Sequence, residues 1–210
     1  MTLSLNEIEV TAKKAARGAG YSWGLAEEAG KATRWLCAHD IDGCAALAGL
    51  LNRVDGVDLS DWSPITGGPV WKAIGGTLCP LVTGAALSDR AYEAGDNETR
   101  LENVTHPVLL APFAALLAQQ TGQTVTVAWP GIHLCTDGGQ IGLTGTLRHD
   151  PGTATVATGG TIDAPNPVCD RADPDSAAWQ TLNAFAHRTY APATEESRLR
   201  GAGAGLSDND

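Results

Sequence analysis

Apolar residues recur at intervals of three and four along the first quarter of the chain, the spacing of one face of a helix. Ser4, with Glu7 three residues later, forms a capping box. Gly18 and Gly20 end this first apolar stripe, and two more stripes follow. The predicted helices cover residues 4–18, 22–37 and 43–53.

The pattern changes in the next part of the chain. Residues 55–76 are rich in Gly, Pro, Ser and Asp and contain two tryptophans, which indicates a long loop or a pair of short strands. The apolar run 78–87 fits either a buried strand or a short helix, because short apolar runs suit both.

Strand and helix patterns alternate in the second half. A strongly apolar helix, 107–120, is predicted between two strands, and this order is that of a right-handed crossover. The turn Asp137-Gly138-Gly139 then separates two runs of strand type, which is typical of a hairpin. A further turn at 150–152 precedes a last strand, and we expect consecutive hairpins. The predicted strands cover residues 101–105, 124–129, 132–136, 140–148 and 153–158.

A last helix is predicted with Asp173 as its cap and Pro174 at its first position. Residues 191–210 are polar and glycine-rich, as flexible tails are. We therefore predict a single α+β domain over residues 1–190, followed by this tail. Its N-terminal helical layer packs on a mixed, partly antiparallel sheet, with a C-terminal helix.

Charge and cysteine content narrow the class of protein. The 210 residues carry a formal net charge of -10. This charge repels nucleic acids and anionic lipid surfaces, so we expect neither to be a main partner. No apolar run reaches the roughly 18 residues of a membrane span. The five cysteines form no C-x-x-C pair, and the first residues lack a secretory signal. We therefore expect reduced thiols and a cytoplasmic location.

Basic residues and glycines gather where the first helix is predicted to end. Backbone N–H groups at the start of the following helix can bind an anion, and Arg17 can add a two-pronged contact. The same Arg-Gly-Ala-Gly sequence recurs at 200–203, so we hypothesise that both copies meet around one small anionic metabolite or one partner. The alternative is a glycine-stopped helix and a tight turn, with no ligand. The predicted ligand-binding residues are Lys13, Arg17, Gly18, Gly20, Trp23, Gly24 and Arg200.

Catalytic candidates are few. Cys79 lies in GGTLCPLVTG, where nearby glycines could let a substrate approach the thiol, although a free cysteine is commonly a small buried residue. Glu27 and Glu28 are acid–base candidates at the predicted helix start, or simply an exposed pair. Three histidines could serve in space as a base for the thiol: His106, His133 and His187.

Two short segments, 37–44 and 133–137, are rich in metal-ligand residue types. Neither has a recognised zinc spacing, so we expect no metal site. The first contains Cys37, His39, Asp40, Asp42 and Cys44, and the second contains His133, Cys135 and Asp137. No sequence motif identifies a cofactor.

Four stretches resemble an uncharacterised bacterial family that is known only as a domain of unknown function: SLNEIE, KKAARGAGYSWGLAEEAGKATRWL, LCPLVTGAALSD and RLRGAGAGLSDND. The resemblance implies a bacterial cytosolic protein and brings no activity, catalytic residue or cofactor.

Two functions therefore remain open. The first is an enzyme, or an enzyme subunit, that acts on a small anionic metabolite near Arg17. The second is a non-catalytic accessory protein that docks on a metabolic enzyme, partly through its tail. A homo-oligomer is compatible with either function.

Overall fold

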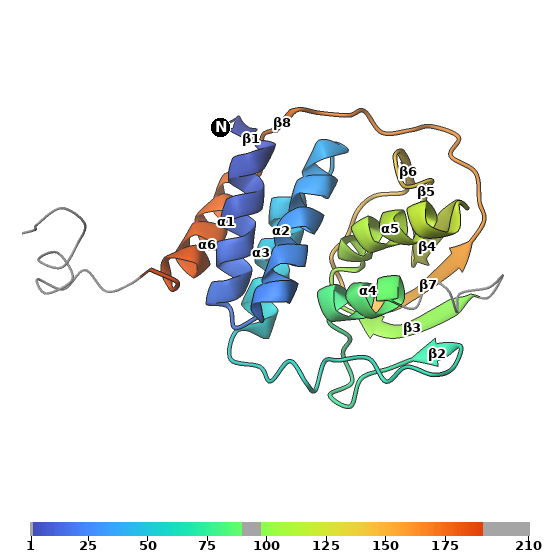
Figure 1. The fold of residues 1–210 in the computed structure, drawn as a ribbon, viewed down its shortest axis with the longest axis horizontal. Coiled ribbons are helices and arrows are strands. Elements are labelled where there is room, and N and C mark those ends of the chain that lie inside the picture. Colours follow the sequence, from blue (N-terminus) through green and yellow to red (C-terminus); the bar gives the residue numbers. More distant parts are fainter. Residues whose placement is uncertain (1, 90–97, 191–210) are drawn as a thin grey trace, which may run out of the picture.

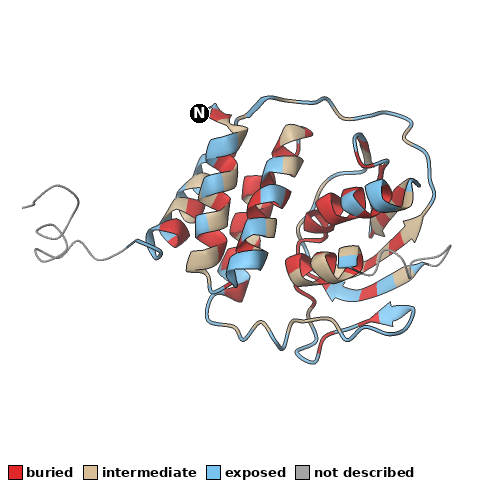
Figure 2. Ribbon diagram, in the orientation of Figure 1, coloured by how far each residue is buried: buried red, intermediate tan, exposed pale blue. Residues whose placement is uncertain are grey.

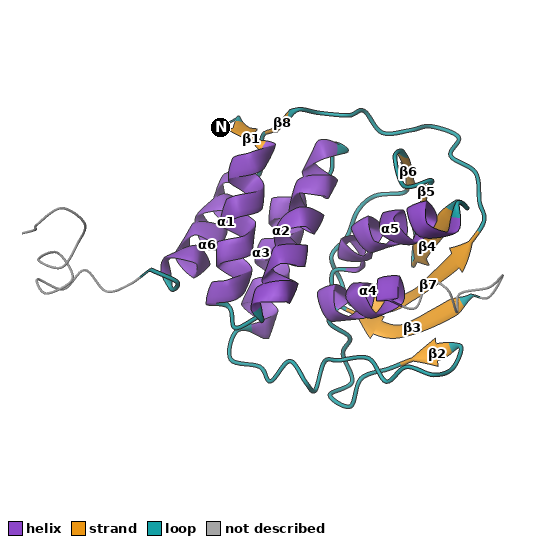
Figure 3. Cartoon of the chain, in the orientation of Figure 1, coloured by secondary structure: helices purple, strands orange, loops and turns teal. Residues whose placement is uncertain are grey.

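The computed structural model describes residues 2–89 and 98–190. Helices and a mixed sheet share the chain, which confirms the predicted α+β class (Figure 3). The helices in this part of the chain are α1 (Leu5–Gly18), α2 (Trp23–Ala38), α3 (Gly43–Val54), α4 (Pro80–Asp89), η2 (Pro107–Leu110, a 3-10 helix), α5 (Ala111–Thr121) and α6 (Ser176–His187).

The main sheet has six strands in the order β2-β3-β7-β4-β5-β6. The pair β2–β3 is parallel and the other neighbours are antiparallel. A separate pair, β1–β8, joins the start of the chain to the segment before α6. The strands are β1 (Leu3–Ser4), β2 (Val70–Trp71), β3 (Thr99–Val104), β4 (Val125–Trp129), β5 (Ile132–Thr136), β6 (Ile141–Thr144), β7 (Gly152–Thr158) and β8 (Arg171–Ala172).

The helices form two groups (Figure 1). α1, α2, α3 and α6 lie side by side, while α4 and α5 lie against the sheet. The first group contacts the rest mainly through α2 and α3, which pack on α4, η2 and α5. Two long connections, residues 55–79 and 159–175, link the two groups of helices (Figure 1). They run along opposite sides of the molecule. The C-terminal helix thus completes the N-terminal helical layer.

Local capping signals fix the starts of the first three helices. Ser4 Oγ accepts a hydrogen bond from Glu7 N at 3.2 Å, and a Glu7 carboxylate oxygen accepts one from Ser4 N at 2.9 Å. The predicted capping box is therefore confirmed. Side chains of Ser22 and Asp42 cap α2 and α3 in the same way, each by accepting a backbone N–H three residues ahead.

The structure corrects three expectations. The cap of α6 is Asp175, whose side chain accepts a hydrogen bond from Ala178 N at 2.8 Å, and not Asp173. The apolar stretch 107–120 divides into η2 and α5. The strand after the 150–152 turn, β7, pairs with β4 and β3 and not with its predecessor β6. β3 and β4 consequently run parallel with β7 between them, because both are antiparallel to it.

Buried apolar residues form one connected cluster that draws from both groups of helices and from the sheet (Figure 2). The sequence of residues 78–87 fits either a buried strand or a short helix. The structure has a helix there, since α4 begins at Pro80. Small side chains face inward on α1, where Ala12, Ala15 and Ala16 are fully buried.

In the described part of the chain, no helix combines the length and apolar character needed to cross a bilayer.

Candidate functional site

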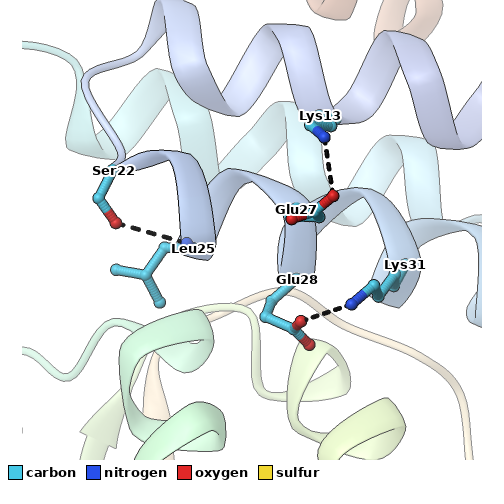
Figure 4. Close-up of polar contacts among 6 residues, drawn as sticks. All are labelled: Lys13, Ser22, Leu25, Glu27, Glu28 and Lys31. Atoms are coloured by element: carbon cyan, nitrogen blue, oxygen red, sulfur yellow. Dashed lines mark hydrogen bonds and ion pairs between the residues drawn. The ribbon is translucent and has the colours of Figure 1, made fainter.

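Ion pairs occupy much of the predicted anion site at the start of α2 (Figure 4). Lys13 Nζ lies 2.9 Å from Glu27 Oε1, and Lys31 Nζ lies 2.9 Å from Glu28 Oε1. The hydrogen bond from Lys13 holds the pKa of Glu27 below its usual range. The charge of Lys13 is therefore balanced within the protein, and both glutamates pair with lysines.

Arg17 and Trp23 do come together. The guanidinium of Arg17 lies 4.9 Å from the centroid of the Trp23 ring and donates a hydrogen bond to Tyr21 O at 2.7 Å. Trp23 is 64% exposed, so this pair lies on the surface. At the start of α2, Ser22 Oγ accepts a hydrogen bond from Leu25 N at 3.4 Å (Figure 4). An anion at this place remains a prediction.

The glycines of this segment have different physical roles. A Cβ on Gly18 would lie 1.9 Å from Phe185 O, so close packing of α1 on α6 requires glycine there. Gly20 has φ +103°, which side chains rarely adopt. Gly24 has open space around it. Arg200, in the second Arg-Gly-Ala-Gly copy, lies outside the described residues.

Cys79 is fully buried, and its Sγ lies 3.2 Å from Tyr21 Oη. Burial raises the pKa of the Cys79 thiol and also that of the Tyr21 phenol. A nucleophilic cysteine needs a stabilised thiolate, and this environment disfavours one. The pair therefore serves packing between the helical groups.

No group of three or more His, Cys, Asp and Glu side chains in the described ranges has the arrangement of a metal site. His39, which belongs to one of the two segments rich in ligand types, has both ring nitrogens next to backbone carbonyls. Nδ1 lies 2.7 Å from Trp35 O and Nε2 lies 3.2 Å from Gly139 O. The Nε2 contact joins the end of α2 to the β5–β6 turn.

A second group of titratable side chains lies where α3 meets the segment between β3 and η2. The rings of His106 and His149 stack with centroids 5.5 Å apart and planes at 21°. His106 follows β3, and His149 lies between β6 and β7. We call these two residues, together with the neighbouring Gly49, Arg53 and Thr105, the histidine site.

His106 is held in a strained conformation. Its φ of 46° and ψ of 58° place it in the left-handed region, and Pro107 follows directly. A non-glycine residue in this region costs roughly 1–3 kcal/mol and persists only where its surroundings impose it. Such strain is concentrated at functional sites, which makes the position a candidate.

Burial keeps both imidazoles neutral. It lowers the pKa of His106 from 6.5 to about 4, with His149 and Arg53 acting in the same direction. Burial also lowers the pKa of His149, against the opposing charges of Asp42 and Asp150. At neutral pH the site therefore presents two uncharged rings beside the Arg53 cation.

Hydrogen bonds connect Arg53, Thr105 and His106. Arg53 donates to Thr105 Oγ1 at 3.4 Å, and Thr105 Oγ1 lies 2.8 Å from His106 Nδ1. The Thr105 hydroxyl therefore bridges the Arg53 guanidinium and the His106 ring. Nδ1 of His149 is buried and has no hydrogen-bond partner among the described residues.

Gly49 provides the space for the His106 ring. A Cβ at this position would lie 2.4 Å from His106 Nε2 and 3.1 Å from Cδ2. The α3 backbone therefore approaches the imidazole as only glycine allows.

Substituting Gly49→Ala should displace the His106 ring and raise its pKa from about 4 toward the ordinary 6.5, because the ring loses its buried position. The free energy of unfolding should change little. Alanine favours the helix by roughly 1 kcal/mol over glycine, and this gain offsets part of the cost of displacing the ring. NMR titration of the imidazole resonances measures the effect. Asn52→Ala, on the exposed side of α3, is the control. An unchanged His106 titration in Gly49→Ala would contradict the close approach.

The histidine site contains groups that acid–base catalysis uses: one imidazole N–H, one unpartnered imidazole nitrogen and a nearby guanidinium. The sequence pattern suggested His106 only as a base for Cys79, and it gave no sign of Gly49, Arg53, Thr105 and His149. These residues come from three separate segments, and no local motif connects them. The place of His106 between a strand and a proline is the one local sign of a special conformation.

Comparison with known proteins finds one family match, which covers the first part of the chain and carries no activity. Residues 3–79 match a family described as "Protein of unknown function (DUF3726)", which confirms the resemblance to an uncharacterised family. The matched range includes Gly49 and Arg53, whereas Thr105, His106 and His149 lie beyond it. No curated protein sequence matches the chain.

Among solved structures, the chain is similar to the crystal structure of malate dehydrogenase from Entamoeba histolytica. The TM-score is 0.47 and the sequence identity is 14% over 88% of this chain. The chain spans 61% of the length of that enzyme. At this level of similarity, the activity of that enzyme does not transfer to this chain.

Proposed function

We propose that this chain is an enzyme, or a subunit of one, that uses the neutral imidazoles of His106 and His149 for acid–base chemistry on a small anionic metabolite. We further propose that it works in a bacterial cytoplasm, where its five free cysteines would stay reduced. The observation that carries the proposal is the stacked histidine pair, in which His106 has a strained backbone and His149 has a buried nitrogen without a partner among the described residues.

Each side chain has a distinct part in this proposal. Arg53 is exposed and supplies the positive charge that attracts an anion to an otherwise acidic protein. His149 is neutral and offers the unpartnered nitrogen that can take a proton. His106 is oriented by the contact of its Nδ1 with Thr105 Oγ1 at 2.8 Å and stacks on the His149 ring.

The surface pair Arg17–Trp23 is the alternative location for the same class of ligand. It has a cation and a helix start, yet Lys13 and both glutamates nearby are already paired. The histidine site adds groups that can move a proton, and for this reason we favour it.

An accessory function is favoured by one different observation. Three branched apolar side chains are exposed within ten residues of the long connection between α3 and α4: Ile65 is 50% exposed, Val70 is 44% and Ile74 is 81%. Such a cluster is a common feature of docking surfaces. The accessory function and the enzyme function predict opposite results in a thermal-shift screen.

A thermal-shift screen against small phosphates, carboxylates, nucleotides and divalent metals tests the proposal. A ligand at 100 times its dissociation constant adds about 2.7 kcal/mol to the free energy of unfolding, which shifts the midpoint visibly. We expect an anionic compound to stabilise the protein. The substitutions Arg53→Gln and His149→Gln should each abolish most of that shift. NMR of the ligand in heavy water then detects proton exchange or turnover, which should stop in His149→Gln.

Two further variants separate the possible locations. Arg34→Gln removes an exposed arginine that pairs with Glu9 on α1, and it should leave the ligand response unchanged. Arg17→Ala should also leave it unchanged. If Arg17→Ala alone loses the response, the ligand binds at the start of α2 and the histidine site is wrong. If no anionic compound stabilises the protein, the enzyme proposal fails and the accessory function stands.

A further inference from the structure

The two faces of the main sheet differ in what covers them. α4 and α5 lie against one face (Figure 1). Strand register aligns Trp71, Leu101 and Ala154 across β2, β3 and β7, and it aligns Trp129 with Ile132 across β4 and β5. All five residues are buried and belong to the core, so this face of the sheet is the inner one.

The opposite face of the sheet is open over much of its width. Successive residues of a strand point to opposite faces, so the residues next to the buried ones lie on the outer face. Each of these residues is exposed or half-buried. The register joins six of them, which we call the outer row: Val70, Arg100, Thr155, Ala128, His133 and Thr144.

The chain itself covers the part of the outer face beside this row. Residues 159–164 cross β4, β5 and β6 there, and the Thr126 hydroxyl donates to Gly159 O at 2.8 Å. A Cβ on Gly160 would lie 2.4 Å from Thr126 Oγ1 and 3.0 Å from Cys135 Sγ, so this segment packs directly on the strands. The outer face therefore carries a second layer over one part, while the outer row stays exposed or half-buried.

Charge indicates which partner fits the outer row. The chain has a formal net charge of -10, so its surface as a whole repels a second copy. Within the six strands of the main sheet, Arg100 and Glu102 are the charged residues, and their charges cancel. The outer face is therefore a surface through which two copies of this acidic chain can meet without net repulsion.

The two charges on β3 are arranged for a two-fold contact. Arg100 and Glu102 are both exposed and two residues apart, so they lie on the same face, about 7 Å apart along the strand. Neither has an ion-pair partner among residues 2–89 and 98–190. A two-fold axis between them sets Arg100 opposite Glu102 of the partner subunit, and the same contact repeats on the other side of the axis.

We propose that two copies of this chain pack face to face through the outer row, with Arg100 of each copy paired to Glu102 of the partner subunit. The small side chains of Thr155 and Ala128 let two sheets approach to the roughly 10 Å of packed sheets. Val70, which also belongs to the exposed cluster on the α3–α4 connection, adds an apolar contact at the edge. This inference does not depend on the histidine site, which contains none of these residues.

Sedimentation equilibrium of the 210-residue chain at micromolar concentration tests the proposal. We expect twice the 21.7 kDa mass of one chain. Ala128→Glu places a carboxylate in the middle of the outer row of both copies, and the mass should fall to that of one chain. Leu116→Glu adds the same charge at an exposed position of α5, on the other side of the sheet, and should leave the dimer intact. A wild-type protein with the mass of one chain, or a dimer that survives Ala128→Glu, would overturn the proposal.

Exchanging the two charges tests the pairing itself. Arg100→Glu and Glu102→Arg should each dissociate the dimer, because like charges then face each other across the two-fold axis. The variant with both substitutions should restore the dimer, since opposite charges again meet. A general effect of either substitution on folding would not be reversed in this way. If the single variants dissociate and the double variant does not reassemble, the pairing is wrong.

Hydroxyl-radical footprinting of the wild-type protein decides the question even if a variant fails to fold. Val70 is 44% exposed and Leu116 is 39% exposed in one chain, so a single copy should be oxidised at both aliphatic side chains. In the dimer, labelling should spare Val70 and modify Leu116. Equal labelling would show that solvent reaches the outer row. A single chain in which Val70 is spared would show that another segment of the same chain covers the row, and either result contradicts a second copy there.

Discussion

Replacing Gly18 with alanine is expected to lower the free energy of unfolding by about 3 kcal/mol. The new Cβ would lie 1.9 Å from Phe185 O and 2.8 Å from Phe185 C. Both atoms belong to the backbone of α6, so no side chain can rotate to relieve the overlap. The two helices must separate, and buried apolar contact between α1 and α6 is lost.

Gly24→Ala is the matched control for this substitution. Gly24 also lies in a helix of the same segment, but no atom beyond its own turn lies within 4 Å of the place that a Cβ would take. Alanine there should be neutral or stabilising by up to about 1 kcal/mol. Urea denaturation followed by tryptophan fluorescence measures both variants. Equal unfolding midpoints for the two would show that α1 and α6 do not pack this closely.

The same glycines bear on the anion hypothesis at the end of α1. Helix packing accounts for Gly18 and a positive φ accounts for Gly20, without any ligand. Loss of ligand response in Gly18→Ala would therefore report on folding. Arg17→Ala is the informative substitution, because the Arg17 side chain lies beside the exposed Trp23 ring and donates a hydrogen bond to backbone.

Acidification from pH 7 to pH 4 should cost the native protein about 3 kcal/mol through His106 alone. The pKa of this imidazole is 6.5 in its ordinary state and about 4 in the folded protein. His106 is only 6% exposed, so solvent screens this effect little. Burial is the main cause, because a charged imidazole loses its hydration there.

The direction of the effect follows from proton binding. Above pH 6.5 the ring is neutral in the folded and unfolded states, and it adds no pH dependence. Between pH 6.5 and about 4 the unfolded chain binds a proton that the folded protein excludes. Stability therefore falls with pH through this window, and below it the loss from this residue is constant.

The substitution His106→Asn isolates this contribution, because asparagine tolerates the left-handed conformation and does not titrate. The difference in unfolding free energy between pH 7 and pH 4 should be about 3 kcal/mol smaller in the variant. His133→Asn, at an exposed position on β5, controls for general effects of losing a histidine. If both variants keep the pH dependence of the wild type, His106 is not buried as a neutral ring.

Local signals in the sequence determined the helices at the start of the chain and the hairpin after β4. The capping box at Ser4 and Glu7 acts over one turn, and the Asp137-Gly138-Gly139 turn acts over a few residues. Hydrogen bonds of this range form whatever the rest of the chain does, so pattern and capping were enough to predict them.

Other parts of the fold depended on contacts that the sequence pattern does not encode. The insertion of β7 between β3 and β4 is a choice among strand edges far apart in the chain. The cap of α6 shifted to Asp175, whose backbone N also donates to Asp42 Oδ2 at 2.9 Å. Because that contact spans most of the chain, the local Asp-Pro signal at 173–174 could not anticipate it.

The sequence by itself determined the α+β class, the basic and glycine-rich segment at the end of α1, and the absence of any familiar catalytic motif. Only the tertiary structure decided that Arg53, His106 and His149 lie together. This grouping arises where separate elements pack. Burial at this junction lowers the pKa of both histidines, and that change depends on neighbours in space and not on neighbours in sequence.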